Sequence, residues 1–324
     1  MPIEKMCPIS IDQFIEKRFF DVDVYIQLTA EKFVLFGRAG SGLDPENLEK
    51  YKQKNVQYFF IRASDFGKLA DRAITIAGMV IGQKNVVASA KIAALENACI
   101  SMFAEIKMVG FNESALGHAG LVAIATMNLV ASYPQLSEMV EKLISNSMRD
   151  ERHALMVSGM ASMIGVAMGW TRTATLERLA LGGMLHDLGK LHLPRDIAEK
   201  NIAEMNHDEK IIYKSHCEFG RDALSKMRAI PDDVRLMVYE HHELADGGGF
   251  PRGIKDLFIS PYGRVLSLAN TFTELVLGFG DTLKKNHVNR AFEVLESHHT
   301  AKFNKDCLKA LKTVIGREWK KDVA

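Results

Sequence analysis

The stretch Leu185-His186-Asp187-Leu188-Gly189-Lys190 places an imidazole and a carboxylate on neighbouring residues. A carboxylate has two oxygens and can bridge two metal ions about 3.5–4 Å apart, so one step of backbone can supply ligands to both ions. Upstream, apolar residues at spacings of three and four predict a helix whose inward face includes Asp187. These residues are Leu176, Leu179, Ala180, Gly183 and Met184. A buried carboxylate must be protonated, paired or bound to metal, and Lys190 can reach it only from the same face.

The composition is that of a globular protein with a large core. The 324 residues suggest about two domains, with 47% apolar and 25% charged residues. The 41 Lys and Arg residues nearly cancel the 40 Asp and Glu residues, so the charge balance does not favour binding to a nucleic acid duplex or to an anionic membrane. Any phosphate binding must therefore be local.

The cysteines are scattered and form no short pair, which excludes a cysteine zinc motif and favours a reducing compartment. They are Cys7, Cys99, Cys217 and Cys307. Charged residues at Glu4, Lys5 and Asp12 interrupt any apolar core of a signal peptide. We therefore expect a cytoplasmic location.

Two uncharged stretches, 114–137 and 154–171, are long enough to cross a membrane. Both are rich in Ala, Gly, Ser and Met, and His118 and Pro134 lie inside the first. This composition favours core helices in close contact, so we expect no membrane span.

The first 63 residues differ in pattern from the rest. Residues 22–28 and 32–38 predict two strands joined by a short turn. Asp44-Pro45-Glu46 predicts the start of a helix that extends to about residue 55, and 56–62 is again rich in strand-forming residues. We interpret 1–63 as a small α/β module that senses a signal or binds a partner, and the alternative is that it simply packs against the rest of the chain.

From residue 64 the pattern is helical. Residues 71–107 predict one or two helices, 113–131 another, and Pro134 opens a further one. The predicted organisation is a helical connector at 64–148 and an all-helical chemical domain at 149–324. The predicted fold class is mainly α, preceded by the small α/β module.

Further histidines share apolar helix faces with neighbours at spacings of three, four and seven. They are His153, His216, His241 and His242. A single core histidine more often bonds a carbonyl than a metal, but four inward positions together with His186-Asp187 favour a metal site. Neutral imidazoles with one carboxylate suit iron, manganese or zinc.

A glycine-rich loop follows the paired histidines. Its three consecutive glycines allow backbone amides to approach an anion, and its arginine has the charge to hold a phosphate. The candidate substrate-binding residues are Gly247, Gly248, Gly249, Phe250 and Arg252. The alternatives are an ordinary turn and a solvated loop arginine.

The ordered set of motifs over residues 149–280 resembles the HD-GYP family, a branch of the HD-domain phosphohydrolases. The set is His153, His186-Asp187 with Gly189-Lys190, His216 with Gly220, His241-His242-Glu243, and Asp246 to Gly253. The resemblance implies an all-helical domain that binds two or three metals, often iron, and hydrolyses cyclic di-GMP.

On this basis, Asp187 would bridge two ions that hold a hydroxide between them, and the hydroxide would attack phosphorus. One ion would be held by His153, His186 and Asn270. The other would be held by His216, His241 and His242. The resemblance assigns Lys190 to neutralise the phosphate or to protonate the leaving oxygen, whereas a lysine that faces water is the alternative.

Four departures from the family pattern weaken the assignment. Phe250 replaces the tyrosine that names the family, Asn270 replaces a metal-binding aspartate, and Arg149 replaces a glutamate one turn before His153. The arginine-containing motif expected at 277–285 is missing. A third metal is therefore not expected.

Two interpretations remain open at this level. The first is a metal-dependent phosphodiesterase that acts on cyclic di-GMP or a related phosphodiester. The second is a metal-bound, catalytically weak signalling module that binds a nucleotide, or a protein partner through its N-terminal region.

Overall fold

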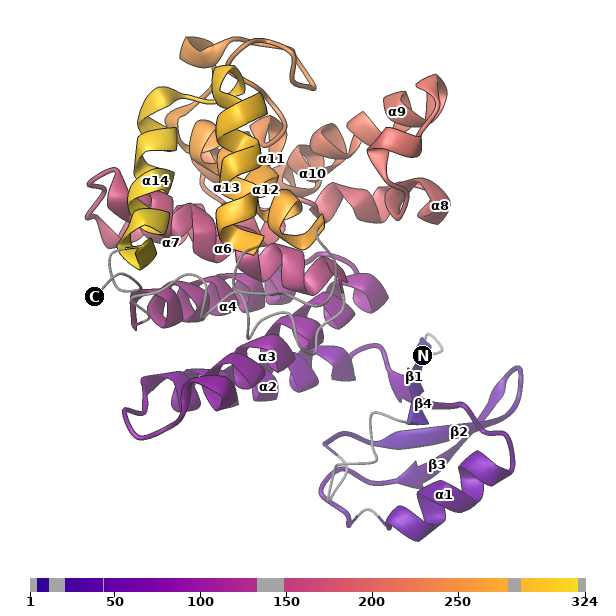
Figure 1. Cartoon of the computed structure of the whole chain (residues 1–324). Coiled ribbons are helices and arrows are strands. Elements are labelled where there is room, and N and C mark those ends of the chain that lie inside the picture. The colour runs from indigo at the N-terminus through magenta and orange to yellow at the C-terminus, as the bar shows by residue number, and fades with distance from the viewer. Residues whose placement is uncertain (1–4, 12–20, 43, 133–148, 279–286, 320–324) are drawn as a thin grey trace.

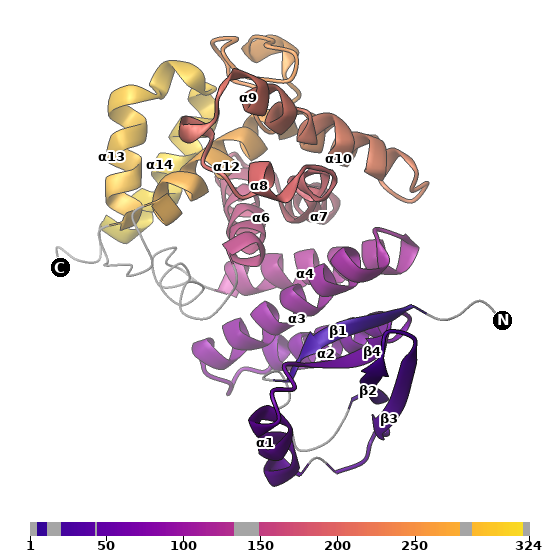
Figure 2. The same cartoon turned by 90° about the vertical axis from the view of Figure 1, so that its right-hand side faces the viewer.

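The computed structural model describes residues 5–11, 21–42, 44–132, 149–278 and 287–319. Figures 1 and 2 both show a small sheet with α1 (Pro45–Gln53) at one end, the helices α2 (Asp65–Gly82), α3 (Ala88–Val109) and α4 (Glu113–Ser132) in the middle, and the helices that follow α4 at the other end. The predicted fold class, mainly α after a small α/β module, is confirmed.

The N-terminal sheet is antiparallel and has the strand order β1-β4-β2-β3. The predicted elements are present as β2 (Val24–Thr29), β3 (Lys32–Gly37), α1 (Pro45–Gln53) and β4 (Tyr58–Arg62). The strand β1 (Met6–Ser10) was not predicted, and it contains Pro8, which cannot donate a ladder hydrogen bond. Since β1 lies at the edge of the sheet, next to β4 alone, this proline is tolerated there.

The module has its own small core. Alternate residues of β4, Phe59 and Ile61, are fully buried, as the two-residue period of a strand requires. Helix α1 begins where predicted, since the Asp44 side chain accepts a hydrogen bond from the Glu46 amide at 3.0 Å. Its Tyr51 packs edge to face against Phe36, which closes the helix onto the sheet.

The predicted region 71–107 forms two helices, α2 and α3, and the prediction at 113–131 is confirmed as α4. Helix α4 is long and apolar enough to cross a membrane by length and composition alone. It packs against α2, α3, α6 (Arg149–Ala167) and α7 (Thr173–Leu185), and half of its most apolar window is buried. The predicted start of a helix at Pro134 lies outside the described residues.

One hydrophobic core extends from Ala70 in α2 to Ile315 in α14 (Lys305–Trp319). The helices of the predicted connector therefore pack into the same core as the predicted chemical domain, and the boundaries at 63 and 148 stay predictions. The C-terminal half also contains α9 (His207–Lys214), α10 (His216–Ser225), α11 (Asp232–Glu240), α12 (Pro261–Gly278) and α13 (His287–His298).

Candidate metal centre

Separate helices bring the predicted histidines to one place. His153 lies on α6, and His186 follows the last residue of α7. His216 begins α10, and His241 follows the last residue of α11. Asp187 precedes the short 3-10 helix η2 (Leu188–His192) and belongs to both groups of potential metal ligands in the described part of the chain.

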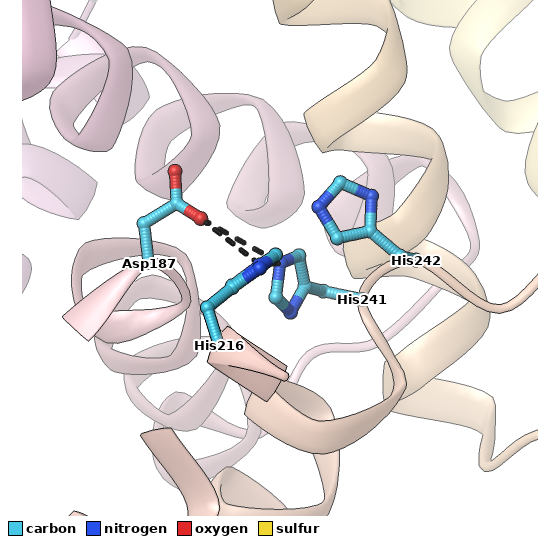
Figure 3. A group of neighbouring side chains, drawn as sticks. All are labelled: Asp187, His216, His241 and His242. Atoms are coloured by element: carbon cyan, nitrogen blue, oxygen red, sulfur yellow. Dashed lines mark hydrogen bonds and ion pairs between the residues drawn. The ribbon is translucent and has the colours of Figure 1, made fainter. Parts of the chain in front are cut away.

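The larger group contains His216, His241, His242 and Asp187, and Figure 3 shows the three rings beside the Asp187 carboxylate. Asp187 Oδ1 lies 3.5 Å from His216 Nε2 and 3.7 Å from His241 Nε2. The two Nε2 atoms are 3.1 Å apart. His216 and His241 are fully buried.

The smaller group contains His153, His186 and Asp187. Here the Nε2 atoms of the two histidines are again 3.1 Å apart. Asp187 Oδ2 lies 3.8 Å from His153 Nε2 and 3.3 Å from His186 Nε2. The two oxygens of one carboxylate therefore face two different groups of imidazoles.

Backbone carbonyls determine which ring nitrogen is free. The Nδ1 atoms of three histidines donate hydrogen bonds to carbonyls three residues earlier. The bonds are His186 to Gly183 at 2.7 Å, His216 to Tyr213 at 2.6 Å and His241 to Val238 at 2.7 Å. Each of these Nδ1 atoms holds the ring proton, so each Nε2 presents a lone pair.

The residues present fit a metal ion. A cation about 2.1 Å from two nitrogens, with an angle of roughly 90–109° between them, requires a nitrogen separation of about 3.0–3.4 Å. Both Nε2 pairs are separated by 3.1 Å. Asp187 Oδ1 and His242 Nε2 are buried and have no hydrogen-bond partner among the described residues. Such atoms are costly to bury, and a cation between them would satisfy both.

The protonation states also suit metal binding. Burial and a neighbouring imidazole lower the pKa of His153 and of His216 to about 3, and burial lowers the pKa of His242 well below its ordinary value. These rings are neutral near pH 7, which is the form that binds metals. Burial opposes ionisation of Asp187, but Lys190 and the histidine contacts hold its pKa well below the usual range.

Lys190 is paired with Asp187, which lies three residues earlier. Its Nζ lies 2.7 Å from Asp187 Oδ2, and about a quarter of the side chain is exposed. Burial opposes its charge, but the Asp187 carboxylate raises the pKa of Lys190 above its ordinary value. The lysine is therefore a fixed positive charge beside the centre.

Asn270 lies at the smaller group. Its side chain is 1% exposed and interacts with His153, and its Oδ1 has no hydrogen-bond partner among the described residues. Its Nδ2 donates to Glu274 Oε1 at 3.4 Å, which fixes Oδ1 on the other side of the amide. An amide oxygen can bind a metal, although it lacks the charge of a carboxylate.

The glycine-rich loop uses several of its amides internally. Gly247 donates to Leu244 O and Gly248 donates to Asp246 Oδ1, both at 2.8 Å. A Cβ at Gly249 would collide with the backbone of residues 242–244, so glycine lets the loop approach the turn that carries His242. These contacts favour a structural role, and binding of substrate by the three glycines stays a prediction.

Arg252 is held by two buried carboxylates. Its guanidinium pairs with Glu240, and its Nε lies 3.9 Å from Glu243 Oε1. Glu240 and Glu243 are each 1% exposed, so the arginine compensates charge that would otherwise be buried alone. This arrangement favours a structural role for Arg252, whose binding of phosphate also stays a prediction.

Two residues near the centre were missed by the sequence analysis, Tyr213 and Glu274. The Tyr213 ring lies 4.9 Å from the His216 ring, and Glu274 contacts Asn270. Their spacings of three and four from a predicted ligand were the available signal. Glu151, two residues before His153, pairs with Lys107 at 3.0 Å, and the number of metal ions stays a prediction.

Comparisons with known proteins match residues 125–306 to the family described as HD domain. A 3'3'-cGAMP-specific phosphodiesterase from Vibrio cholerae is 32% identical over 99 residues, which are 31% of this chain and 22% of that protein. A cyclic di-GMP phosphodiesterase from Thermotoga maritima is 30% identical over 130 residues, which are 40% of this chain and 35% of that protein. The chain thus spans about a third or less of the length of these two relatives.

Among solved structures, an HDG"Y"P protein from Bdellovibrio bacteriovorus has a TM-score of 0.66 and 16% identity, and the match covers 96% of this chain and all of the other. This likeness shows a shared fold. The family match covers more than half of the chain and agrees with the resemblance drawn from the motifs. The chain therefore belongs to the HD-domain family.

Proposed function

We propose that the chain is a metal-dependent phosphodiesterase that hydrolyses cyclic di-GMP or a related cyclic dinucleotide. The observation that carries the proposal is the placement of Asp187, whose two oxygens face two separate groups of imidazoles. The matched relatives are phosphodiesterases of cyclic di-GMP and of 3'3'-cGAMP, which supports this class of substrate.

In this proposal His153, His186 and Asn270 would hold one ion, and His216, His241 and His242 would hold the other. Asp187 would contribute to both sites. Iron, manganese and zinc all accept this set of nitrogen and oxygen donors. When bound, two such ions would activate water for attack and stabilise the charge on the phosphate oxygens.

Lys190 has the position to stabilise charge on the substrate. Its Nζ is bonded to the Asp187 oxygen that faces the smaller group, so it lies beside any phosphate that binds there. A fixed positive charge at this point would lower the energy of the developing negative charge on phosphorus-bound oxygens. Its raised pKa favours this role over donation of a proton to the leaving oxygen.

A catalytically weak signalling module is the second candidate. Two observations favour it, namely the neutral amide at position 270 and the pairing of Arg252 with Glu240 and Glu243. In this case the metal centre would stabilise the fold, and the protein would act through a bound nucleotide or a protein partner.

One experiment separates the two candidates. Protein purified without added metal is analysed for metal, reloaded with iron, manganese or zinc, and incubated with cyclic di-GMP, 3'3'-cGAMP and a chromogenic phosphodiester. We expect close to two ions per chain and linear or mononucleotide products from at least one cyclic dinucleotide. Chelator-treated protein is the control. Tight nucleotide binding without turnover under all metals would support the signalling module, and absence of any bound metal would contradict both.

A further inference from the structure

Tyr213 is a buried tyrosine at the edge of the candidate metal centre to which the proposed mechanism gives no role. It lies in the last turn of α9 and is 7% exposed. Its carbonyl accepts the Nδ1 proton of His216 at 2.6 Å, so the backbone of this residue already orients one predicted ligand. The aromatic side chain is therefore held at a fixed place beside the centre.

Two aromatic rings border the histidines of the larger group. The Tyr213 ring centroid lies 4.9 Å from that of His216 and 6.4 Å from that of His242. Phe250 stacks on His242 with a centroid distance of 4.4 Å, and it packs against the small apolar cluster to which Tyr213 belongs. Of these two rings, only Tyr213 carries a hydroxyl group.

Lys190 lies close to both this tyrosine and Asp187. Its Nζ lies 5.4 Å from the centroid of the Tyr213 ring and 2.7 Å from Asp187 Oδ2. An ammonium group near an aromatic ring is attracted by the ring, and a phenol oxygen can accept one of its three protons.

We propose that Tyr213 is a positioning residue that holds the Lys190 ammonium beside Asp187, with the phenol oxygen accepting one ammonium proton. A lysine side chain has many rotamers, and a charge acts on a phosphate only from a defined place. Two of the three Lys190 protons are then bound by Asp187 and Tyr213, and the third points to the substrate. This proposal rests on the proposed phosphodiesterase function.

The test is a double-mutant cycle between Tyr213→Phe and Lys190→Met. Tyr213→Phe keeps the ring and deletes the hydroxyl. We expect it to lower kcat about tenfold, with KM changed by less than about twofold and the metal content unchanged. In the Lys190→Met background the same substitution should have no further effect, because the tyrosine acts through the lysine.

Tyr262→Phe is the matched control, because Tyr262 packs edge to face on Trp170 at 5.3 Å and has no contact with Lys190 among those described. A purely structural role of Tyr213 predicts equal losses in both backgrounds, and that result, or full activity of Tyr213→Phe, would overturn the proposal. Loss of metal from Tyr213→Phe would also overturn it.

A second measurement keeps the two proposals distinguishable. Calorimetry measures the affinity for inorganic phosphate of the metal-loaded parent protein, of Tyr213→Phe, of Lys190→Met and of the double variant. We expect weaker phosphate binding by Tyr213→Phe only when Lys190 is present. If no phosphodiester is hydrolysed, the proposed function fails, whereas this cycle still decides whether Tyr213 positions Lys190. Additive effects on phosphate affinity would contradict the positioning role.

Discussion

Two regions of this molecule combine buried histidines with carboxylates, and they use them in opposite ways. In the first region, His118 on α4 lies between two carboxylates, with Nδ1 2.5 Å from Glu105 Oε2 and Nε2 2.8 Å from Asp71 Oδ1. In the second region, the candidate metal centre, one carboxylate is surrounded by five imidazoles. The ratio of carboxylates to imidazoles is thus reversed between the two.

The protonation states follow this ratio. Burial alone would lower the pKa of His118, but hydrogen bonds and charge from Asp71 and Glu105 raise it above the ordinary value. At the centre, burial and neighbouring rings lower the pKa of His153 and of His216 to about 3. A charged imidazole between two acids forms a salt bridge by itself, whereas neutral imidazoles around one acid need a cation.

The largest effect is expected from Asp187→Asn, because this substitution removes the carboxylate that both groups share. The amide keeps the size of the side chain and deletes the charge that would hold two ions. We expect bound metal to fall well below two ions per chain and phosphodiester turnover to fall about a thousandfold or more. Metal analysis and initial rates on a cyclic dinucleotide measure both effects.

Asp233→Asn is the control for this prediction. Asp233 pairs with Arg178 at 2.5 Å on the surface of α11, and its substitution should leave metal content and turnover unchanged. An Asp187→Asn protein that keeps two tightly bound ions would mean that the imidazoles alone hold the metal, and the contrast with the His118 cluster would lose its basis.

The next largest effect is a difference in metal affinity between the smaller and the larger group, which we call the two halves of the centre. His153→Ala leaves the smaller group with His186, Asn270 and Asp187, so we expect that ion to be lost, with its affinity reduced about a hundredfold or more. His216→Ala leaves two imidazoles and Asp187, so its ion should bind more weakly and yet remain. Titration with a chelator, followed by metal analysis, measures the difference. Equal losses from both variants would contradict an asymmetric centre.

The sequence was sufficient to predict the histidines and Asp187 as neighbours because each lies on, or directly after, a helix whose apolar spacing indicates which face points inward. The three-residue spacing left open whether Lys190 reaches Asp187 or faces water, and the structure shows the two side chains paired at 2.7 Å. The sequence could not predict which Asp187 oxygen faces which group, because this depends on how α6, α10 and α11 pack around η2.

Contacts between residues far apart in the sequence could not be predicted either, because they also depend on how the helices pack. His118 and Asp71 are 47 residues apart, and no local pattern connects them. The engagement of Arg252 by Glu240 depends on the path of the glycine loop, so the expectation of a phosphate-binding arginine came from charge alone. Strand β1 was not predicted, and only the sheet order reveals that its Pro8 lies on an edge.

The salt bridge at His118 should depend on pH in a defined direction. Because the folded-state pKa is raised above the ordinary value of 6.5, the stabilisation is complete below pH 6.5 and is lost as the pH rises through the folded-state pKa. We expect His118→Gln to lower the free energy of unfolding by about 2–3 kcal/mol at pH 6 and by less at pH 9. Most of this comes from buried Glu105, since Asp71 is largely exposed.

Urea denaturation of the parent protein and the variant at both pH values measures the effect. His207→Gln, at an exposed position at the start of α9, is the matched control and should change stability little at either pH. If the loss at His118→Gln were greater at pH 9 than at pH 6, the histidine would be neutral in the folded protein, and the contrast with the metal centre would disappear.

The smallest effect is expected from Asn270→Asp. This substitution replaces a weak amide ligand of the smaller group with a carboxylate, so that the smaller group, like the larger one, offers four strong ligands. Asn270 Oδ1 is buried and has no hydrogen-bond partner in the part of the chain that the structure describes, so a carboxylate there would add a charged oxygen ligand without changing the shape of the site. Glu274 lies beside it and would repel the new charge, which limits the gain. We expect metal affinity of this half to rise about tenfold, equivalent to about 1.4 kcal/mol.

Asn112→Asp is the matched control, because the Asn112 side chain accepts a hydrogen bond from the Ala115 amide at the start of α4. Unchanged affinity in Asn270→Asp would show that the amide oxygen does not face the ion, and that His153 and His186 hold it with Asp187 alone.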